Sequence, residues 1–138
     1  MIHILIIEDS ASDVRAYAPL FSEGREVDLL FLRRNGPENS EELRELVAVH
    51  CGEVGIKKYL LSEEAEIPAL LKERPYDFYI ADSLGGASPS LLRAGGIPKE
   101  KIAFLSSTTS FREMIINEGY RAYRKDAIGE LIAECLPS

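Results

Sequence analysis

The chain has 138 residues, of which 46% are hydrophobic and 28% charged, and its formal net charge at pH 7 is −7. These values predict one globular domain over residues 1–138 and exclude a disordered or membrane-embedded chain. The negative charge argues against non-specific binding to nucleic acid or to an anionic membrane. Cys51 and Cys135 form neither a disulfide framework nor a zinc motif, and the first residues carry no basic signal-peptide region, so we expect a cytoplasmic location.

Apolar runs and turn residues predict strands that alternate with helices along the whole chain. In chain order we expect a strand over 2–7, a helix over 12–23, a strand over 27–32, a helix over 39–54, a strand over 56–61, a helix over 62–72, a strand over 76–81, a short helix over 90–94, a strand over 102–105, a helix over 111–118, a strand over 120–123 and a helix over 127–136. This alternation predicts a parallel sheet covered on both faces by helices, with right-handed crossovers.

Local signals support several of these boundaries. Pro19 lies inside the first expected helix and predicts a kink or an early end. Residues 35–37 read Asn-Gly-Pro, which is typical of a turn. Asn39 is the expected N-cap of the next helix, with Glu42 as its capping-box partner.

Polar residues follow the strands at the points where those strands end. Glu8 and Asp9 come after the first strand, Asp82 after the strand over 76–81, Ser106 after the next, and Lys125 after the last. Because ligands of such sheets bind beyond the carboxyl ends of the strands, we expect these side chains to meet at one edge.

Clustered carboxylates repel one another unless a cation lies among them. Hard oxygen ligands suit Mg²⁺, and a carboxylate beside that ion can act as a nucleophile towards a phosphoryl group. A lysine would neutralise the transferring oxygens, and a serine hydroxyl could donate a hydrogen bond to one of them. The residue types therefore predict reversible phosphorylation of an aspartate. Taken singly, each residue also fits a structural role: Glu8 and Asp9 as helix-capping acids, Asp82 as a turn residue, and Lys125 as a solvated charge.

This arrangement resembles the receiver domain of two-component response regulators. The matching residues are Glu8 and Asp9 for the acidic pair, Asp82 for the phospho-acceptor, Ser106 for the switch hydroxyl and Lys125 for the lysine. The resemblance implies a flavodoxin-like three-layer α/β/α sandwich. It also implies Mg²⁺ bound by Asp9 directly, by Glu8, by Asp82 and by the backbone carbonyl of Leu84.

The sequence departs from the receiver pattern in several places. Asp9 and Asp82 lie 73 positions apart, which is roughly one strand–helix unit longer than the family pattern and places an added unit in about residues 27–55. Either the strand over 27–32 or that over 56–61 is then the added one. Asp126 follows Lys125 where the family has proline, and the loop after Asp82 lacks the usual Met-Pro. The switch aromatic is either Tyr123 or Tyr120, and Tyr123 is favoured.

The resemblance implies a stand-alone signalling module rather than an enzyme, with at most self-phosphorylation from a phosphodonor and autodephosphorylation. Its expected partners are a histidine kinase or phosphotransfer protein and a downstream output protein, and the choice between monomer and homodimer stays open. One alternative is a pseudo-receiver that binds proteins without phosphorylation. A weaker alternative is a small Mg²⁺-dependent phosphohydrolase, for which no separate acid–base pair is evident.

Overall fold

The computed structural model describes residues 1–22, 24–34 and 36–137, so Glu23 of the expected first helix and Asn35 of the expected turn lie outside the described residues. The strands are β1 (Ile2–Glu8), β2 (Arg25–Leu32), β3 (Ile56–Ser62), β4 (Phe78–Ala81), β5 (Ile102–Leu105) and β6 (Arg121–Tyr123). The α-helices are α1 (Ser40–Cys51), α2 (Ile67–Glu73), α3 (Ser88–Ala94), α4 (Thr109–Asn117) and α5 (Ile128–Cys135). The 3₁₀ helices are η1 (Ser12–Leu20), η2 (Glu64–Glu66), η3 (Leu84–Gly86) and η4 (Lys99–Lys101).

The six strands form one sheet in the order β3-β2-β1-β4-β5-β6, and every pair is parallel. This confirms the predicted doubly wound α/β sandwich, with the flavodoxin-like strand order extended by one strand outside β2. The edge strand is β3, so by position the added unit is α1–β3, which extends beyond the range of 27–55 expected from the sequence. Exposed Lys57 and Lys58 on β3 disfavour pairing of this edge with another chain.

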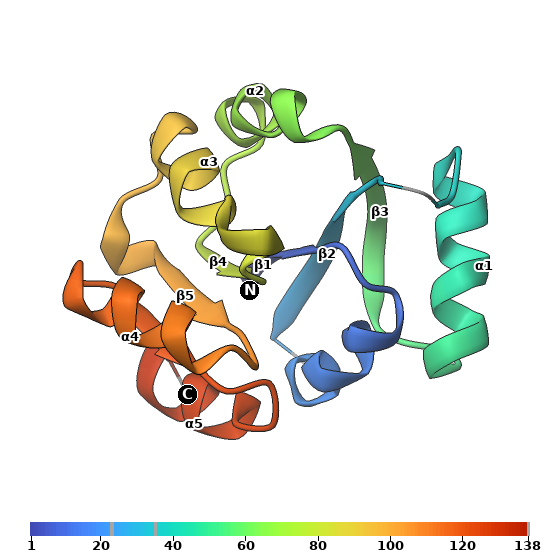
Figure 1. The fold of residues 1–138 in the computed structure, drawn as a ribbon. Helices are drawn as coiled ribbons and strands as arrows, with labels where there is room; N and C mark the ends of the chain where they lie inside the picture. The colour runs from blue at the N-terminus through green and yellow to red at the C-terminus, as the bar shows by residue number, and fades with distance from the viewer. Residues whose placement is uncertain (23, 35, 138) are drawn as a thin grey trace.

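Helices cover both faces of the sheet (Figure 1), and an apolar cluster lies on each face. The cluster on one face packs η1, α1 and α5 against side chains such as Ile4 and Ile6, whereas the cluster on the other packs α2, α3 and α4 against Leu5 and Ile7. Successive residues of β1 point to opposite faces, which explains why its sequence is continuously apolar. Burying each such side chain contributes about 2 kcal/mol, and the resulting rigid sheet fixes the positions of the strand ends.

The helix expected after β1 is present over Ser12–Leu20, and it is a 3₁₀ helix. The helix ends at Leu20, immediately after Pro19. This is the early end that Pro19 predicted as an alternative to a kink. Val14, Tyr17 and Leu20 lie buried beneath it at three-residue spacing, which matches the three residues per turn of such a helix. Among the helices that the structure describes, none combines the length and the apolar character needed to cross a membrane.

Candidate functional site

The site lies at the carboxyl ends of β1 and β4, where the winding of the sheet reverses. The chain leaves β1 through η1 towards β2, and it leaves β4 through α3 towards β5, on the opposite face. Connections that diverge in this way leave a crevice between the two strand ends. In the β1–β4 register Ile7 pairs with Ala81, which brings the next residues, Glu8 and Asp82, to the crevice together.

Glu8 ends β1 with its side chain completely buried. Its Oε1 accepts hydrogen bonds from the backbone N–H groups of Asp9 at 3.1 Å and Ser10 at 3.3 Å. Its Oε2 accepts from the Tyr17 hydroxyl at 2.9 Å and from Lys125 Nζ at 2.7 Å. Every lone-pair direction of a buried carboxylate needs such a donor, because an unsatisfied charge in the core is strongly destabilising.

Burial raises the pKa of Glu8 to about 7, and the neighbouring Asp82 carboxylate adds to this rise while Lys125 opposes it. Burial also disfavours the charged form of Lys125, but the carboxylates of Glu8 and Asp82 outweigh it and raise the pKa of the ammonium group. Tyr17 has its pKa raised by burial and by the Glu8 carboxylate, so its hydroxyl stays protonated and keeps donating. Near pH 7 the site therefore contains a permanent cation beside a carboxyl group that is partly protonated.

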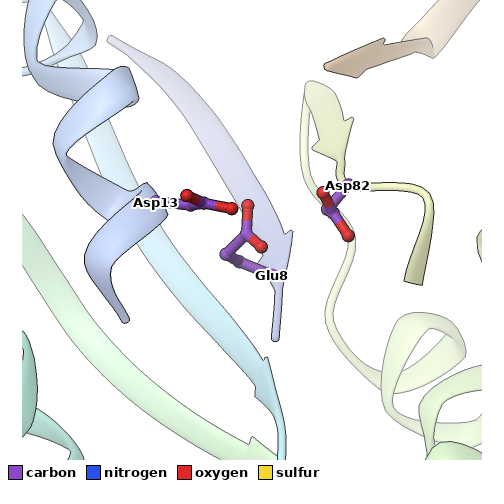
Figure 2. Close-up of side chains that lie close together, drawn as sticks. All are labelled: Glu8, Asp13 and Asp82. Atoms are coloured by element: carbon purple, nitrogen blue, oxygen red, sulfur yellow. The ribbon is translucent and has the colours of Figure 1, made fainter. Parts of the chain in front are cut away.

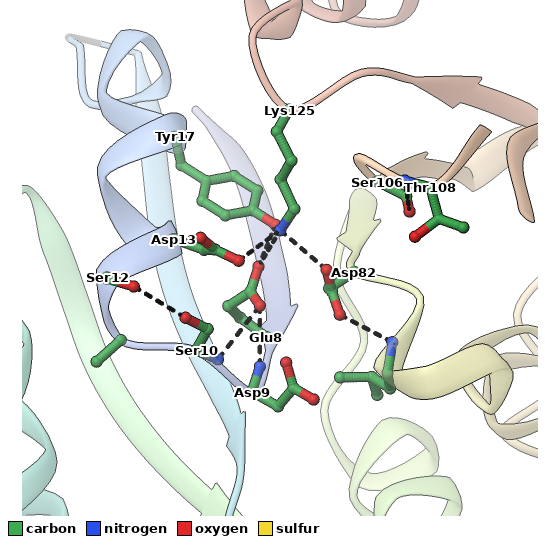
Figure 3. Close-up of polar contacts among 12 residues, drawn as sticks. Glu8, Asp9, Ser10, Ser12, Asp13, Tyr17, Asp82, Ser106, Thr108 and Lys125 are labelled. Carbon is green, nitrogen blue, oxygen red and sulfur yellow. Dashed lines mark hydrogen bonds and ion pairs between the residues drawn. The ribbon is translucent and has the colours of Figure 1, made fainter.

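Lys125 follows β6 and extends its ammonium group into the middle of three acids (Figure 3). Its Nζ lies 2.7 Å from Glu8 Oε2, 2.9 Å from Asp82 Oδ1 and 3.5 Å from Asp13 Oδ2. We call these four side chains the lysine cluster. The side chain of Lys125 is only 17% exposed, so these contacts are weakly screened by solvent.

The three acids of the lysine cluster are also the residues that could hold a metal ion. Glu8, Asp13 and Asp82 each offer a carboxylate oxygen within 4.8 Å of the others, and Figure 2 shows them facing one another from β1, η1 and the end of β4. Carboxylate oxygens are the ligands that Mg²⁺ prefers, so the donor types fit that ion, but Lys125 Nζ contacts the same three carboxylates and would have to share them with it. The set differs from the one expected from the sequence, since it contains Asp13 and does not contain Asp9.

Asp82 is held by the strained loop that follows it. Its Oδ2 accepts a hydrogen bond from Leu84 N at 2.8 Å, which leaves Oδ1 for Lys125. Leu84 has a φ of 51°, and it is the one non-glycine residue of the described chain with positive φ. This conformation costs about 1 kcal/mol, and the buried Leu84 side chain and the bond to Asp82 keep it in place.

Asp9 belongs to a separate set of contacts, which we call the arginine bridge. Arg34 Nε donates to Asp9 Oδ2 at 3.2 Å, and Arg34 Nη2 donates to the carbonyl oxygen of Leu84 at 3.3 Å. Figure 3 shows the Asp9 carboxylate on the side of the site away from Lys125. Two of the expected metal ligands, Asp9 and the Leu84 carbonyl, thus share a guanidinium group.

The hydroxyl groups of the two expected switch residues form hydrogen bonds with residues outside the lysine cluster. Ser106 is buried after β5, and its hydroxyl accepts a hydrogen bond from Thr108 N at 3.1 Å, as at the start of a helix. Tyr123 donates its hydroxyl to Glu134 on α5 at 2.8 Å, and its pKa is raised by burial together with Cys135 and Glu134. The alternative aromatic, Tyr120, packs edge-on against Phe104 on the opposite face of the sheet.

Three residues of the site were not expected from the sequence: Asp13, Tyr17 and Arg34. η1 brings Asp13 to within 3.5 Å of Lys125 Nζ and the Tyr17 hydroxyl to Glu8 Oε2. The sequence predicted a helix here but not which of its residues would face the end of β1. Arg34 lies in the loop between β2 and α1, where no periodic pattern constrains a side chain. The sequence signal for Arg34 was a basic residue near the carboxyl end of a central strand. An excess of acids at this end of the sheet makes an ion pair with such a residue expected.

The arrangement combines a nucleophilic carboxylate, an ammonium group beside it and additional acids, which is a set suited to a cation and a phosphoryl group. The site contains four carboxylates, those of Glu8, Asp9, Asp13 and Asp82, and two cationic side chains, Lys125 and Arg34. The difference is two negative charges when all are ionised, and it is smaller near pH 7, where Glu8 is partly protonated. Comparisons with protein-family models, with curated proteins and with solved structures find no match for this chain.

Proposed function

We propose that this protein is a receiver-like signalling module that is phosphorylated on Asp82 in a Mg²⁺-dependent reaction and signals through a partner protein. A histidine kinase or phosphotransfer protein would supply the phosphoryl group. The observation that carries the proposal is the position of Lys125, whose ammonium group contacts both Asp82 and Glu8 from a strand end 43 residues further along the chain than Asp82. A phosphoryl-transfer site requires an acid, a nucleophile and a cationic group close together. Here three separate strand ends supply these groups.

The chemistry proposed is a displacement at phosphorus. An oxygen of Asp82 attacks the phosphorus of an acyl phosphate or phosphohistidine, the bond from phosphorus to the leaving oxygen or nitrogen breaks, and an acyl phosphate of the aspartate is formed. Bound Mg²⁺ would supply positive charge to the phosphoryl oxygens. Lys125 is already 2.9 Å from Asp82 Oδ1, so it would contact the phosphoryl group without a large movement. Ser106 and Tyr123 are proposed as the residues that respond to that group.

Incubation with a small acyl phosphate and Mg²⁺ is expected to add one phosphoryl group to the protein, as measured by intact-mass spectrometry. Because the reaction needs the divalent cation, the same incubation with a chelator in place of Mg²⁺ is expected to give the unmodified mass. An unmodified mass at high phosphodonor and high Mg²⁺ would contradict the proposal. A modified mass that is equal with and without the chelator would contradict the role of the metal.

The arginine bridge favours one alternative, a pseudo-receiver that binds its partner without phosphorylation. Arg34 already supplies a cation to Asp9 and to the Leu84 carbonyl, so this half of the site is neutralised by the protein itself. The added unit α1–β3 would then carry partner contacts. This alternative expects partner binding that is identical for the wild type and for a variant that cannot be phosphorylated, in the presence or absence of phosphodonor.

A further inference from the structure

We propose that Arg34 is a built-in competitor for the divalent cation. It occupies Asp9 and the Leu84 carbonyl, two oxygen donors beyond the three acids Glu8, Asp13 and Asp82 that could hold the ion, and Arg34 must leave them before the ion can bind there. This inference rests on the proposed function, because it concerns the regulation of the same site. It adds a residue outside the receiver-like motif and connects the site to the loop that leads into α1.

The geometry of the arginine bridge carries the inference. Arg34 contacts a carboxylate oxygen at 3.2 Å and a backbone carbonyl oxygen at 3.3 Å, which are two hard oxygen ligands of the kind that Mg²⁺ takes. A guanidinium group is always charged in a protein. An ion bound to the same two oxygens would lie close to a like charge, so the two cations exclude each other.

The loop after Asp82 gives a reason why the contact to Leu84 matters. Leu84 adopts its positive φ with its N–H on Asp82 and its carbonyl on Arg34. Leu84 therefore contacts both Asp82, the proposed phospho-acceptor, and Arg34. Displacing Arg34 frees the carbonyl of Leu84 without breaking the bond that its N–H makes to Asp82.

The side chain of Arg34 is less enclosed than that of Lys125. Its side chain is 49% exposed, whereas that of Lys125 is 17% exposed and in contact with three acids. A hollow of about 220 Å³ lies beside it, lined by residues that include Asp9, Gly36 and Pro37. Exposed ion pairs are weak, so a divalent cation with full charge can displace this one at modest cost.

The test is the Mg²⁺ affinity of the whole chain, measured by isothermal titration, in the wild type and in Arg34→Ala. We expect Arg34→Ala to bind Mg²⁺ roughly fivefold more tightly, which is the change that loss of one exposed ion pair would give. Arg33→Ala is the matched control, because it removes the same charge from the adjacent position, where the side chain pairs with Glu63 instead. Its affinity is expected to stay close to that of the wild type.

A double variant, Arg34→Ala with Asp9→Asn, tests whether the gain comes from Asp9. If Arg34 competes for that carboxylate, the gain is lost in the double variant. Equal affinity of the wild type and Arg34→Ala, an equal gain in Arg33→Ala, or no Mg²⁺ binding by either protein would each overturn the inference.

Phosphorylation measured on the same proteins separates this inference from the proposed function. Phosphorylation of the wild type with no affinity gain in Arg34→Ala would leave the function standing and overturn the role of Arg34. An affinity gain with no phosphorylation of any variant would support the role of Arg34 and contradict the proposed function.

Discussion

Replacing Lys125 with methionine is expected to lower the free energy of unfolding by about 3 kcal/mol at pH 8 and by about 1 kcal/mol at pH 5. Methionine preserves the length of the side chain but removes the ammonium group that lies among Glu8, Asp13 and Asp82. Removing one partner of a buried pair is strongly destabilising, because the charge that remains is buried without compensation. Chemical denaturation in a metal-free buffer at the two pH values measures both quantities.

The pH dependence follows from the buried carboxyl group of Glu8. Burial raises its pKa to about 7 in the folded protein, from 4.5 as the ordinary value. Between these values the folded chain binds more protons than the unfolded chain, so stability falls as the pH rises through this window. Lys125 lowers the pKa of Glu8, so its removal moves the pKa higher and enlarges the loss of stability at pH 8. At pH 5 the carboxyl group is protonated in the folded variant and the loss is smaller.

Lys101→Met is the control for this experiment, since Lys101 is exposed in η4, which directly precedes β5 and so lies at the opposite edge of the sheet from the three acids. Its effect is expected to stay within about 0.5 kcal/mol at both pH values. A loss of stability in Lys125→Met that is equal at pH 5 and pH 8 would show that Glu8 does not titrate in this range. No loss at either pH would contradict the ion pairs themselves.

Replacing Asp82 with asparagine is expected to reduce phosphoryl incorporation to the level seen without phosphodonor. The amide oxygen of asparagine can still accept the hydrogen bond from Leu84 N, so the loop conformation is retained. An uncharged amide is not a nucleophile towards phosphorus, and the reaction therefore stops although the fold is unchanged. Intact-mass spectrometry measures the incorporation, and thermal denaturation verifies the fold.

Two matched variants locate the modification. Asp126→Asn removes an exposed acid that pairs with Arg124, and its incorporation is expected to equal that of the wild type. Asp13→Asn removes the outermost acid of the lysine cluster, which is also one of the three acids that could hold Mg²⁺, so its incorporation is expected to be reduced but not abolished. Incorporation that persists in Asp82→Asn and disappears in Asp13→Asn would assign the acceptor to η1 instead of to the end of β4.

Most of the fold could be predicted from the sequence because each strand and helix carries its own periodic pattern. The continuous apolar run of β1 indicates a strand buried on both faces, and the four-residue spacing of Leu43 and Val47 indicates a helix with one buried face. The order of strands in a sheet is not a local property. From the sequence alone, either the strand over 27–32 or that over 56–61 could therefore be the added edge strand. The pair Lys57 and Lys58 was the available clue, since adjacent exposed lysines are typical of an edge strand.

The residues of the lysine cluster that could be predicted lie at the end of a strand or within two residues of it. Glu8, Asp82 and Lys125 were brought to one edge by the parallel sheet, and the sheet followed from the pattern. Asp13 and Tyr17 depend on how η1 packs against the end of β1, which tertiary packing decides and the pattern of η1 alone does not. Arg34 depends on the path of a loop, where side-chain contacts are set by tertiary packing rather than by sequence period.

The most direct measurement of the central claim is an amide NMR titration of the isotope-labelled protein with Mg²⁺, followed by the phosphoryl mimic beryllofluoride. If the crevice between β1 and β4 binds the ion and the phosphoryl group, Mg²⁺ shifts the amide signals of Asp9 and Leu84, and beryllofluoride then shifts those of Asp82, Ser106 and Lys125. The second set of shifts is expected to be absent in Asp82→Asn. Spectra that stay superimposable through both additions would contradict the claim that this edge of the sheet is a phosphoryl-accepting site.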